Sequence, residues 1–417
     1  MQSALPLAEK AYLLRCKVLG QAHMDTLESL HQFAFICGYL KDYQKALELK
    51  EKAYTLRREQ LGEEHPDTLA SMHNYASACG KVGDYQRAMA LNEQVYELRT
   101  KVLGQHHKDT ISSLCNFAYS CSCAGAHQRA QQLYEQAYSV QRVVLGEKHP
   151  QTIVSLRNLS YEHRALQNWE IAKSLQERAY TLCRQAYGEN DENTLSVLFD
   201  IVVSCEKLGV DEDRIAYCER LYTLCHRKWG AEHPDTVKAM NKYAAAYRKQ
   251  GYYEKALELD RRLYDIQCRT IGQTHTDTID TLQAIATAYA KLKNEENAIE
   301  TQKQVYDLRK KILGEEHWKT LLALTNLAGI YRAYGQYKKA LELYQMLYAL
   351  RCKVNGADHI STLAVLEAIA YTHYSLGEKG QALALLDKLY VQRCEKQGAD
   401  HPDTLRTGKD IDFLKNS

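Results

Sequence analysis

A glycine that returns every 42 residues constrains the fold of this chain more than any other feature. Ten glycines keep this spacing without insertion or deletion: Gly20, Gly62, Gly104, Gly146, Gly188, Gly230, Gly272, Gly314, Gly356 and Gly398. A threonine follows each glycine by six residues, and a histidine follows nine of them by three, with Asp191 as the exception. A fixed period of about 20–50 residues is typical of stacked repeats, in which each unit contacts only its neighbours.

Each period contains two amphipathic helical patterns. In the second unit, apolar residues recur at helical spacing over 68–81 and again over 85–103. Gly83 lies between the two segments and suits a helix C-cap. Asp67 or Thr68 is expected to cap the start of the first helix. The repeat is therefore predicted to be a helical hairpin with a short first helix and a longer second one.

One stretch of this repeat matches a known motif, NxAxxxxxxGxYxxAxxL. It is carried by Asn74, Ala76, Gly83, Tyr85, Ala88 and Leu91. This unit resembles the tetratricopeptide repeat, and the long second helix followed by LGxxHPDTL is similar to the 42-residue variety of kinesin light chains and many bacterial tetratricopeptide proteins. The resemblance covers essentially the whole chain. It implies an all-α fold, a right-handed α-solenoid of helix hairpins.

The two ends of the chain differ from the internal repeats. Residues 1–417 are expected to form a single array: a half-repeat over 1–22, about nine hairpins over 23–403, and a terminal helix over 404–417. Natural arrays usually end in polar capping elements, and the start of this sequence does not look like one. We therefore expect a piece of a longer protein. As an alternative function, the array would be the sensor or autoinhibitory arm of a signalling ATPase or protease whose effector domain lies elsewhere in the full-length chain.

Charge and hydropathy restrict the partners. Lys and Arg number 54 and Asp and Glu 52, which leaves a net charge of +2 and no global preference for nucleic acid or anionic membrane. No apolar run approaches the roughly 18 residues that span a bilayer, and the N-terminus lacks the apolar core of a signal peptide. We expect a cytoplasmic protein whose partner is a protein or an extended peptide, rather than nucleic acid or membrane.

The thirteen cysteines are interpreted as reduced core residues. Two groups share a repeat position: Cys16, Cys268, Cys352 and Cys394, and Cys37, Cys79, Cys121 and Cys205. Equivalent positions in stacked helices lie at least about 8–10 Å apart, whereas a disulfide needs Cα atoms within about 7 Å. The pair Cys121 and Cys123 lacks a second pair at zinc spacing. No metal and no cofactor is expected.

Other periodic residues are interpreted as parts of the scaffold. The tyrosine eight residues before each glycine is expected to pack one repeat against the next, and each histidine to fix its loop by a local hydrogen bond rather than bind metal. Six units place an arginine five residues before the glycine. The central units have Gln141, Cys183, Cys225 and Gln267 there, so we expect a partly exposed position, with the arginine on a solvated face or bonded to a neighbouring loop. No P-loop, GxSxG, HExxH or dinucleotide fingerprint occurs, and we predict no enzyme.

Selection of a partner should depend on positions that vary between units. In the resembling fold the first helices line the concave face, and one position there reads Gln32, Asn74, Asn116, Asn158, Asp200, Lys242, Ala284, Asn326 and Ala368. Asparagine offers donors and an acceptor, and relatives use such a row to bind a peptide backbone. Around it lie basic residues in the middle of the array: Arg157, Arg164, Lys207, Lys238, Lys242, Arg248, Lys249 and Arg332. Aromatic side chains at Tyr119, Tyr161, Phe199, Tyr371 and Tyr374 offer flat apolar contacts.

We therefore predict a non-catalytic scaffold that binds an extended, acidic peptide or protein segment in its concave groove. Amide groups would bind the peptide backbone, and arginine and lysine would pair with acidic side chains. Arg164 and Arg248 are expected to face solvent in the free protein. The predicted binding residues are Asn74, Asn116, Arg157, Asn158, Tyr161, Arg164, Lys242, Arg248, Asn326 and Arg332.

Overall fold

The computed structural model describes residues 4–416, and within that range it contains twenty helices and no strand. The chain divides into two compact units, unit 1 (Met1–Tyr217) and unit 2 (Cys218–Ser417), and the division falls inside α11 (Asp211–Trp229). The helices before α11 are α1 (Ala4–Leu19), α2 (Met24–Tyr39), α3 (Tyr43–Leu61), α4 (Pro66–Val82), α5 (Tyr85–Leu103), α6 (Lys108–Cys123), α7 (His127–Val144), α8 (Pro150–Ala165), α9 (Trp169–Tyr187) and α10 (Glu192–Leu208). Those after it are α12 (Pro234–Lys249), α13 (Tyr253–Thr270), α14 (Thr276–Lys291), α15 (Glu295–Leu313), α16 (Trp318–Ala333), α17 (Tyr337–Asn355), α18 (Ile360–Ser375), α19 (Lys379–Gln397) and α20 (Pro402–Asn416).

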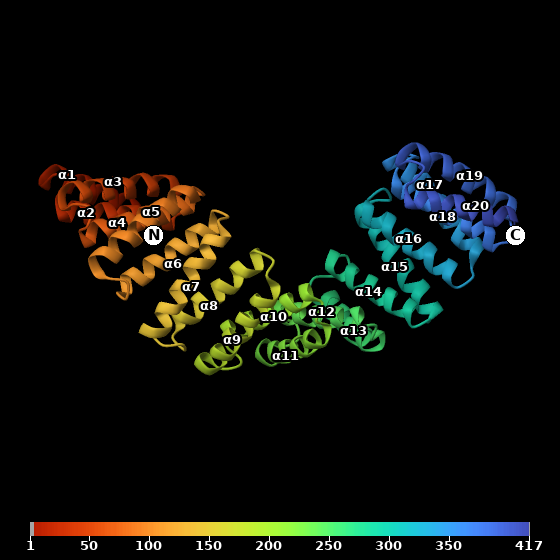
Figure 1. The fold of residues 1–417 in the computed structure, drawn as a ribbon, viewed down its shortest axis with the longest axis horizontal. Helices are drawn as coiled ribbons and strands as arrows, with labels where there is room; N and C mark the ends of the chain where they lie inside the picture. Colours follow the sequence, from red (N-terminus) through yellow and green to blue (C-terminus); the bar gives the residue numbers. More distant parts are fainter. Residues whose placement is uncertain (1–3, 417) are drawn as a thin grey trace. The chain divides into compact units, whose positions relative to one another are not determined.

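In unit 1 each helix from α1 to α9 packs against the next one along the chain, and in unit 2 each helix from α12 to α19 does so, as Figure 1 shows. The predicted all-α class of repeated hairpins is confirmed, and the second helix expected over 85–103 is α5. The predicted first helix over 68–81 is two residues longer at its start and one at its end, and the terminal helix begins at Pro402 rather than 404. Residues 1–3 and 417 of the predicted end elements lie outside the described residues.

The side chain that caps each first helix is the histidine. Nδ1 of His65 accepts a hydrogen bond of 3.2 Å from the backbone N–H of Asp67. The same bond occurs at His23, His107, His149, His233, His275, His317, His359 and His401. Where the histidine is missing, Oδ1 of Asp191 accepts the equivalent bond at 2.9 Å. The expectation of a local histidine bond is confirmed, and the expectation that Asp67 or Thr68 caps the helix is wrong.

The threonine closes the same loop from the other side. Thr68 lies inside the helix, fully buried, and its hydroxyl donates to the carbonyl of Arg57 in the preceding helix. Thr152 donates instead to the carbonyl of Gly146, which lies in the loop after α7, at 2.9 Å. Either bond ties the start of a first helix to the end of the preceding repeat. The glycine itself has a positive φ, 85° at Gly62, which side chains other than glycine rarely adopt.

The periodic tyrosines pack between repeats, as predicted. The ring of Tyr54 on α3 stacks on Tyr75 of α4 with centroids 6.1 Å apart. Tyr12 stacks on Phe33 in the same way at 6.4 Å. Such offset aromatic pairs add specific contact energy to the burial of their apolar area. The interface between a second helix and the following first helix is therefore built around these rings in unit 1.

The arginine five residues before the glycine occurs in six units and is buried in three of them, at Arg57, Arg309 and Arg393, which corrects its assignment to a solvated face there. Arg99 and Arg351 are half-buried, and Arg15 is exposed. Arg57 is 8% exposed and donates to Oγ of Ser71 on the next first helix at 2.6 Å. The alternatives Gln141, Cys183, Cys225 and Gln267 are also buried, so the expectation of a partly exposed position is wrong in these units. It holds at Arg15, Arg99 and Arg351. The hydroxyl of Ser71 satisfies one N–H of Arg57, whereas its Nε is buried without a hydrogen-bond partner among the described residues.

All thirteen cysteines are free, and those of the Cys37 group are buried in the core. No cluster of three His, Cys, Asp or Glu side chains that could hold a metal ion occurs within residues 4–416. None of the helices in that range is long and apolar enough to cross a bilayer.

Candidate functional site

Two adjoining hollows on the first-helix face of unit 1 form what we call the unit-1 groove. The smaller hollow lies among α2, α3 and α4 and has a volume of about 190 Å³. The larger one lies among α4, α5 and α6 and has a volume of about 490 Å³. Ser77 and Lys81 line both hollows. Other residues that line the two hollows are Phe35, Tyr39, Tyr43, Lys50, His73, Tyr85, Asn92, Asn116, Tyr119, Ser120 and Cys123.

The walls of the unit-1 groove are aromatic. Phe35 is 60% exposed, Tyr39 62% and Tyr119 63%. Phe35 and Tyr119 occupy the same repeat position, which Tyr161 on α8 also occupies at 56% exposure. Large exposed rings are unfavourable in water unless a partner covers them, and aromatic residues are enriched among binding hot spots.

The charge of the unit-1 groove is positive. Lys50 and Lys81 line it, and no carboxylate does. Burial lowers the pKa of the Lys50 ammonium, and the like charge of Lys81 lowers it further. Burial also lowers the pKa of His73, with help from Arg99, so this imidazole is neutral at pH 7. Its Nδ1 is buried without a hydrogen-bond partner among the described residues.

Hydrogen bonds fix the floor of the larger hollow. Nδ2 of Asn92 on α5 donates to Oγ of Ser120 on α6 at 2.6 Å. The hydroxyl of Ser120 in turn donates to the backbone carbonyl of Asn116 at 2.9 Å. The side-chain amide of Asn116 makes no hydrogen bond among the described residues, and Asn116 lines the hollow from α6.

The predicted asparagine row lies on successive first helices. Asn74, Asn116 and Asn158 are half-buried on α4, α6 and α8, and Asn326 is half-buried on α16 in unit 2. None of the four side-chain amides makes a hydrogen bond within the described part of the chain. Asn116 alone of the four lines the unit-1 groove, so the structure brings only part of the predicted row to a hollow.

The basic residues of the predicted site are largely engaged with the protein itself. Arg157 donates to Oγ of Ser196 at 2.8 Å, and Arg164 pairs with Asp200 at 2.5 Å. Lys242 is half-buried on α12, and Arg332 is exposed on α16.

Arg248 forms an ion pair inside the protein, although the sequence analysis expected it to face solvent. Its Nη1 lies 2.5 Å from both carboxylate oxygens of Asp260, a fully buried residue of α13. Burial raises the pKa of Asp260, and Arg248 opposes that shift. The expectation that Arg164 and Arg248 face solvent is wrong, since only 22% of each side chain is exposed. Asp260 comes from a second helix, where the sequence analysis sought no site residue.

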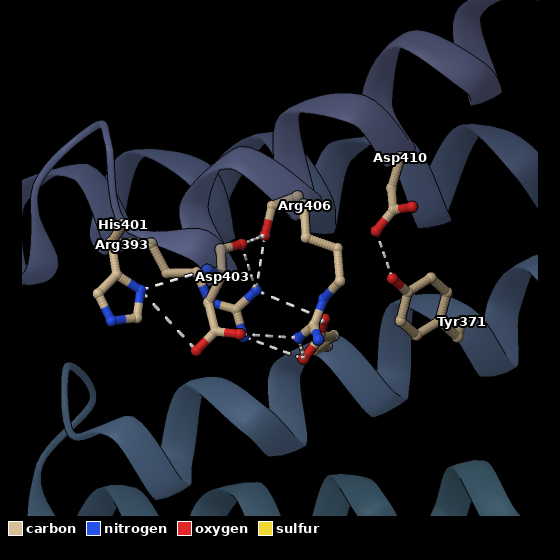
Figure 2. A network of polar contacts seen from close by, with 8 residues as sticks. Tyr371, Arg393, His401, Asp403, Arg406 and Asp410 are labelled. Carbon is tan, nitrogen blue, oxygen red and sulfur yellow. Dashed lines mark hydrogen bonds and ion pairs between the residues drawn. The ribbon is translucent and has the colours of Figure 1, made fainter.

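At the end of unit 2, a carboxylate network links α18, α19 and α20, as Figure 2 shows. Glu367 on α18 accepts hydrogen bonds from Arg393 at 3.0 Å and Arg406 at 3.1 Å. Asp403 pairs with Arg406 at 3.2 Å, and the hydroxyl of Tyr371 donates to Asp410 at 2.5 Å. Arg393 and Arg406 are thus neutralised within the protein.

Sequence reasoning missed Lys50, Lys81 and His73. A signal for Lys50 was present, because its repeat position in the second helix carries polar residues in several units. They are Lys50, Asn92, Gln176, Asp260 and Gln302. All but Lys50 are buried, although polar residues are ordinarily exposed. This position lies beneath the hollows between first helices. A comparison of the residues at this position across the repeats would have indicated the groove.

A family model described as Tetratricopeptide repeat matches residues 25–101, 109–165, 277–353 and 320–390, more than half of the chain. The chain belongs to the tetratricopeptide repeat family. A second model with the same description matches residues 152–193 and 236–277. The predicted family is therefore confirmed, and the 42-residue period fits the spacing of the helices.

Several solved structures of tetratricopeptide proteins resemble this array. One contains the nearly identical TPR-like repeats of a Podosopora anserina protein described as a kinesin light chain, with 25% identity, a TM-score of 0.46, and coverage of 49% of this chain and 96% of that one. BtubC (BKLC) from P. vanneervenii has 16% identity and a TM-score of 0.45, covering 56% and 91% of the two chains. The apo form of RapI has 12% identity and a TM-score of 0.46, covering 84% and 97%. No curated protein shows significant sequence similarity to the chain.

Proposed function

We propose that this tetratricopeptide array is a non-catalytic scaffold that binds an extended protein segment along the first-helix face of unit 1. Arrays of this family generally mediate protein–protein interaction. The observation that carries the proposal is the unit-1 groove, where exposed aromatic rings stand beside the unused amide of Asn116. An amide of this kind can donate to and accept from a peptide backbone whatever the side chains of the peptide.

The charge of the groove supports an acidic ligand. The positive charge that favours it comes from Lys50 and Lys81, rather than from Arg164 and Arg248, which have partners in the protein. The net charge of +2 supports a protein partner over nucleic acid or membrane. Thirteen free cysteines support a reducing compartment such as the cytoplasm.

The test is a titration of mutant proteins with a peptide selected from a random library. Asn116→Ala and Asn158→Ala should each weaken binding about tenfold, because a lost hydrogen bond that strands its partner costs about 1–3 kcal/mol. Asn190→Ala, in an exposed loop, is the control and should leave the affinity unchanged. Unchanged affinity in both Asn116→Ala and Asn158→Ala would move the binding site off the first-helix face.

A further inference from the structure

Two ammonium groups of the unit-1 groove lack a counter-charge. Lys50 is half-buried on α3, and Lys81 is exposed at the end of α4. Both line the smaller hollow, and Lys81 reaches the larger one as well. Within residues 4–416 neither makes an ion pair or a side-chain hydrogen bond. A half-buried cation without a partner is unfavourable, because it loses hydration without gaining a counter-ion.

Cations that surround the groove differ in this respect. Lys45 pairs with Glu9 at 3.3 Å and Arg87 with Glu51 at 2.6 Å. One repeat further along the chain, Arg129 forms the equivalent pair with Glu93. The repeats therefore supply a carboxylate for each of these neighbours and none for the two lysines, so the missing anion is expected to arrive with a ligand.

The donors in the groove are suited to a doubly charged anion. A carboxylate brings one negative charge, whereas a phosphoryl group brings about 1.5–2 at pH 7, with three strong acceptor oxygens. Lysine binds phosphate well as a point charge. The unused amide of Asn116 and the imidazole of His73 add polar groups beside Lys81.

We propose that the unit-1 groove is a phosphopeptide site, in which Lys50 and Lys81 hold the phosphorylated side chain of the bound segment. The inference rests on the proposed function, since it names the ligand chemistry of the same face. It predicts that phosphorylation of the partner strengthens its binding, and that the effect weakens as salt rises, because exposed charges are screened over about 8–10 Å at physiological ionic strength.

The experiment uses the full chain and three immobilised nonapeptide libraries, degenerate except for a central phosphoserine, serine or glutamate. The wild-type protein should be retained about tenfold more on the phosphoserine library than on the serine library, because hydrogen bonds to charged groups are the stronger ones. Lys50→Gln and Lys81→Gln should each remove most of that difference, because they lower retention on phosphoserine far more than retention on serine. Lys108→Gln, an exposed lysine of α6 without a pairing partner among the described residues, is the matched control.

The outcomes separate this inference from the proposed function. Equal retention on phosphoserine and serine, with Asn158→Ala still weakening both, overturns the phosphoryl site and leaves the scaffold function standing. Equal retention on glutamate and phosphoserine assigns the lysines to a carboxylate and also overturns it. The protein could also bind phosphatidic acid vesicles more strongly than the phosphoserine library, in a way that requires the lysines. That result would assign the phosphoryl group to a lipid rather than a peptide and overturn the proposal. Circular dichroism melting checks that the variants fold, and Lys81, being exposed, keeps the test valid if Lys50→Gln does not.

Discussion

The same two repeat positions carry opposite electrostatics in the two units. In unit 1, the half-buried imidazole of His73 lies near Arg99, which donates to Ser113 at 2.8 Å but reaches no carboxylate among the described residues. Seven repeats later, Glu367 replaces the histidine and pairs with Arg393 at 3.0 Å. The guanidinium is retained in both units, whereas its neutralisation is not. The 42-residue period therefore fixes where the arginine lies. The residue on the preceding first helix determines whether a carboxylate neutralises that arginine or the arginine stays available to a ligand.

The largest effect is expected where unit 2 buries its carboxylate. Arg248→Met should lower the free energy of unfolding by about 3–5 kcal/mol, because it strands the buried charge of Asp260. Denaturant unfolding followed by circular dichroism measures the change. Arg262→Met, which breaks an exposed pair with Glu258, should cost at most about 1 kcal/mol. The double variant Arg248→Met and Asp260→Leu is expected to recover stability. A loss in Arg248→Met as small as that in Arg262→Met would contradict the buried-pair assignment.

Exchanging the residues of the two units tests the comparison directly. Glu367→His should lower the free energy of unfolding by about 1–3 kcal/mol, because Arg393 and Arg406 lose their shared acceptor. The reverse change, His73→Glu, should supply Arg99 with a carboxylate and reduce retention on the phosphoserine library about tenfold. Both are measured against the wild type at one ionic strength. Stronger phosphopeptide binding by His73→Glu would show that the charge of the groove does not select the ligand.

A feature that the two units share should respond equally in both. His65→Ala and His317→Ala each remove a side-chain cap, at a cost of about 0.5–2 kcal/mol. His65→Asp should cost much less, since Asp191 already performs this role in one repeat. Thermal melting of the three variants measures the effect. A loss in only one unit would mean that capping depends on the neighbouring repeats rather than on the loop itself.

The smallest effect concerns Lys50 and has the opposite sign. Lys50→Met should raise the free energy of unfolding at pH 7, by up to about 1 kcal/mol, by removing a half-buried charge. Because the folded pKa of Lys50 is lowered from its ordinary 10.5, the folded protein binds fewer protons there, and the penalty is fully present below the lowered pKa. The advantage of the variant should therefore shrink as pH rises toward 10.5. Melting at pH 7 and pH 10 tests this, and a constant advantage would contradict an ionised Lys50.

The repeat sequence alone determined the family, the hairpins and most helix boundaries. These follow from interactions within about ten residues of each other, such as a glycine at positive φ or a histidine bonded two residues on. The one local error, a cap assigned to Asp67 or Thr68 rather than His65, concerns neighbouring residues that all have capping chemistry. The resemblance to the tetratricopeptide repeat likewise placed Asn116 and Tyr119 on the first-helix face, and both line the unit-1 groove.

Only the tertiary structure decided which charges are available. Arg248 and Lys50 are both basic residues of repeated helices, yet Arg248 meets the buried Asp260 and Lys50 meets no carboxylate. Those encounters join side chains from different helices, at positions that the period does not relate to one another. An ion pair depends on distances of a few ångströms, whereas a repeat pattern records only spacing along the chain. The fold could therefore be predicted from the sequence, and the electrostatics of the candidate site could not.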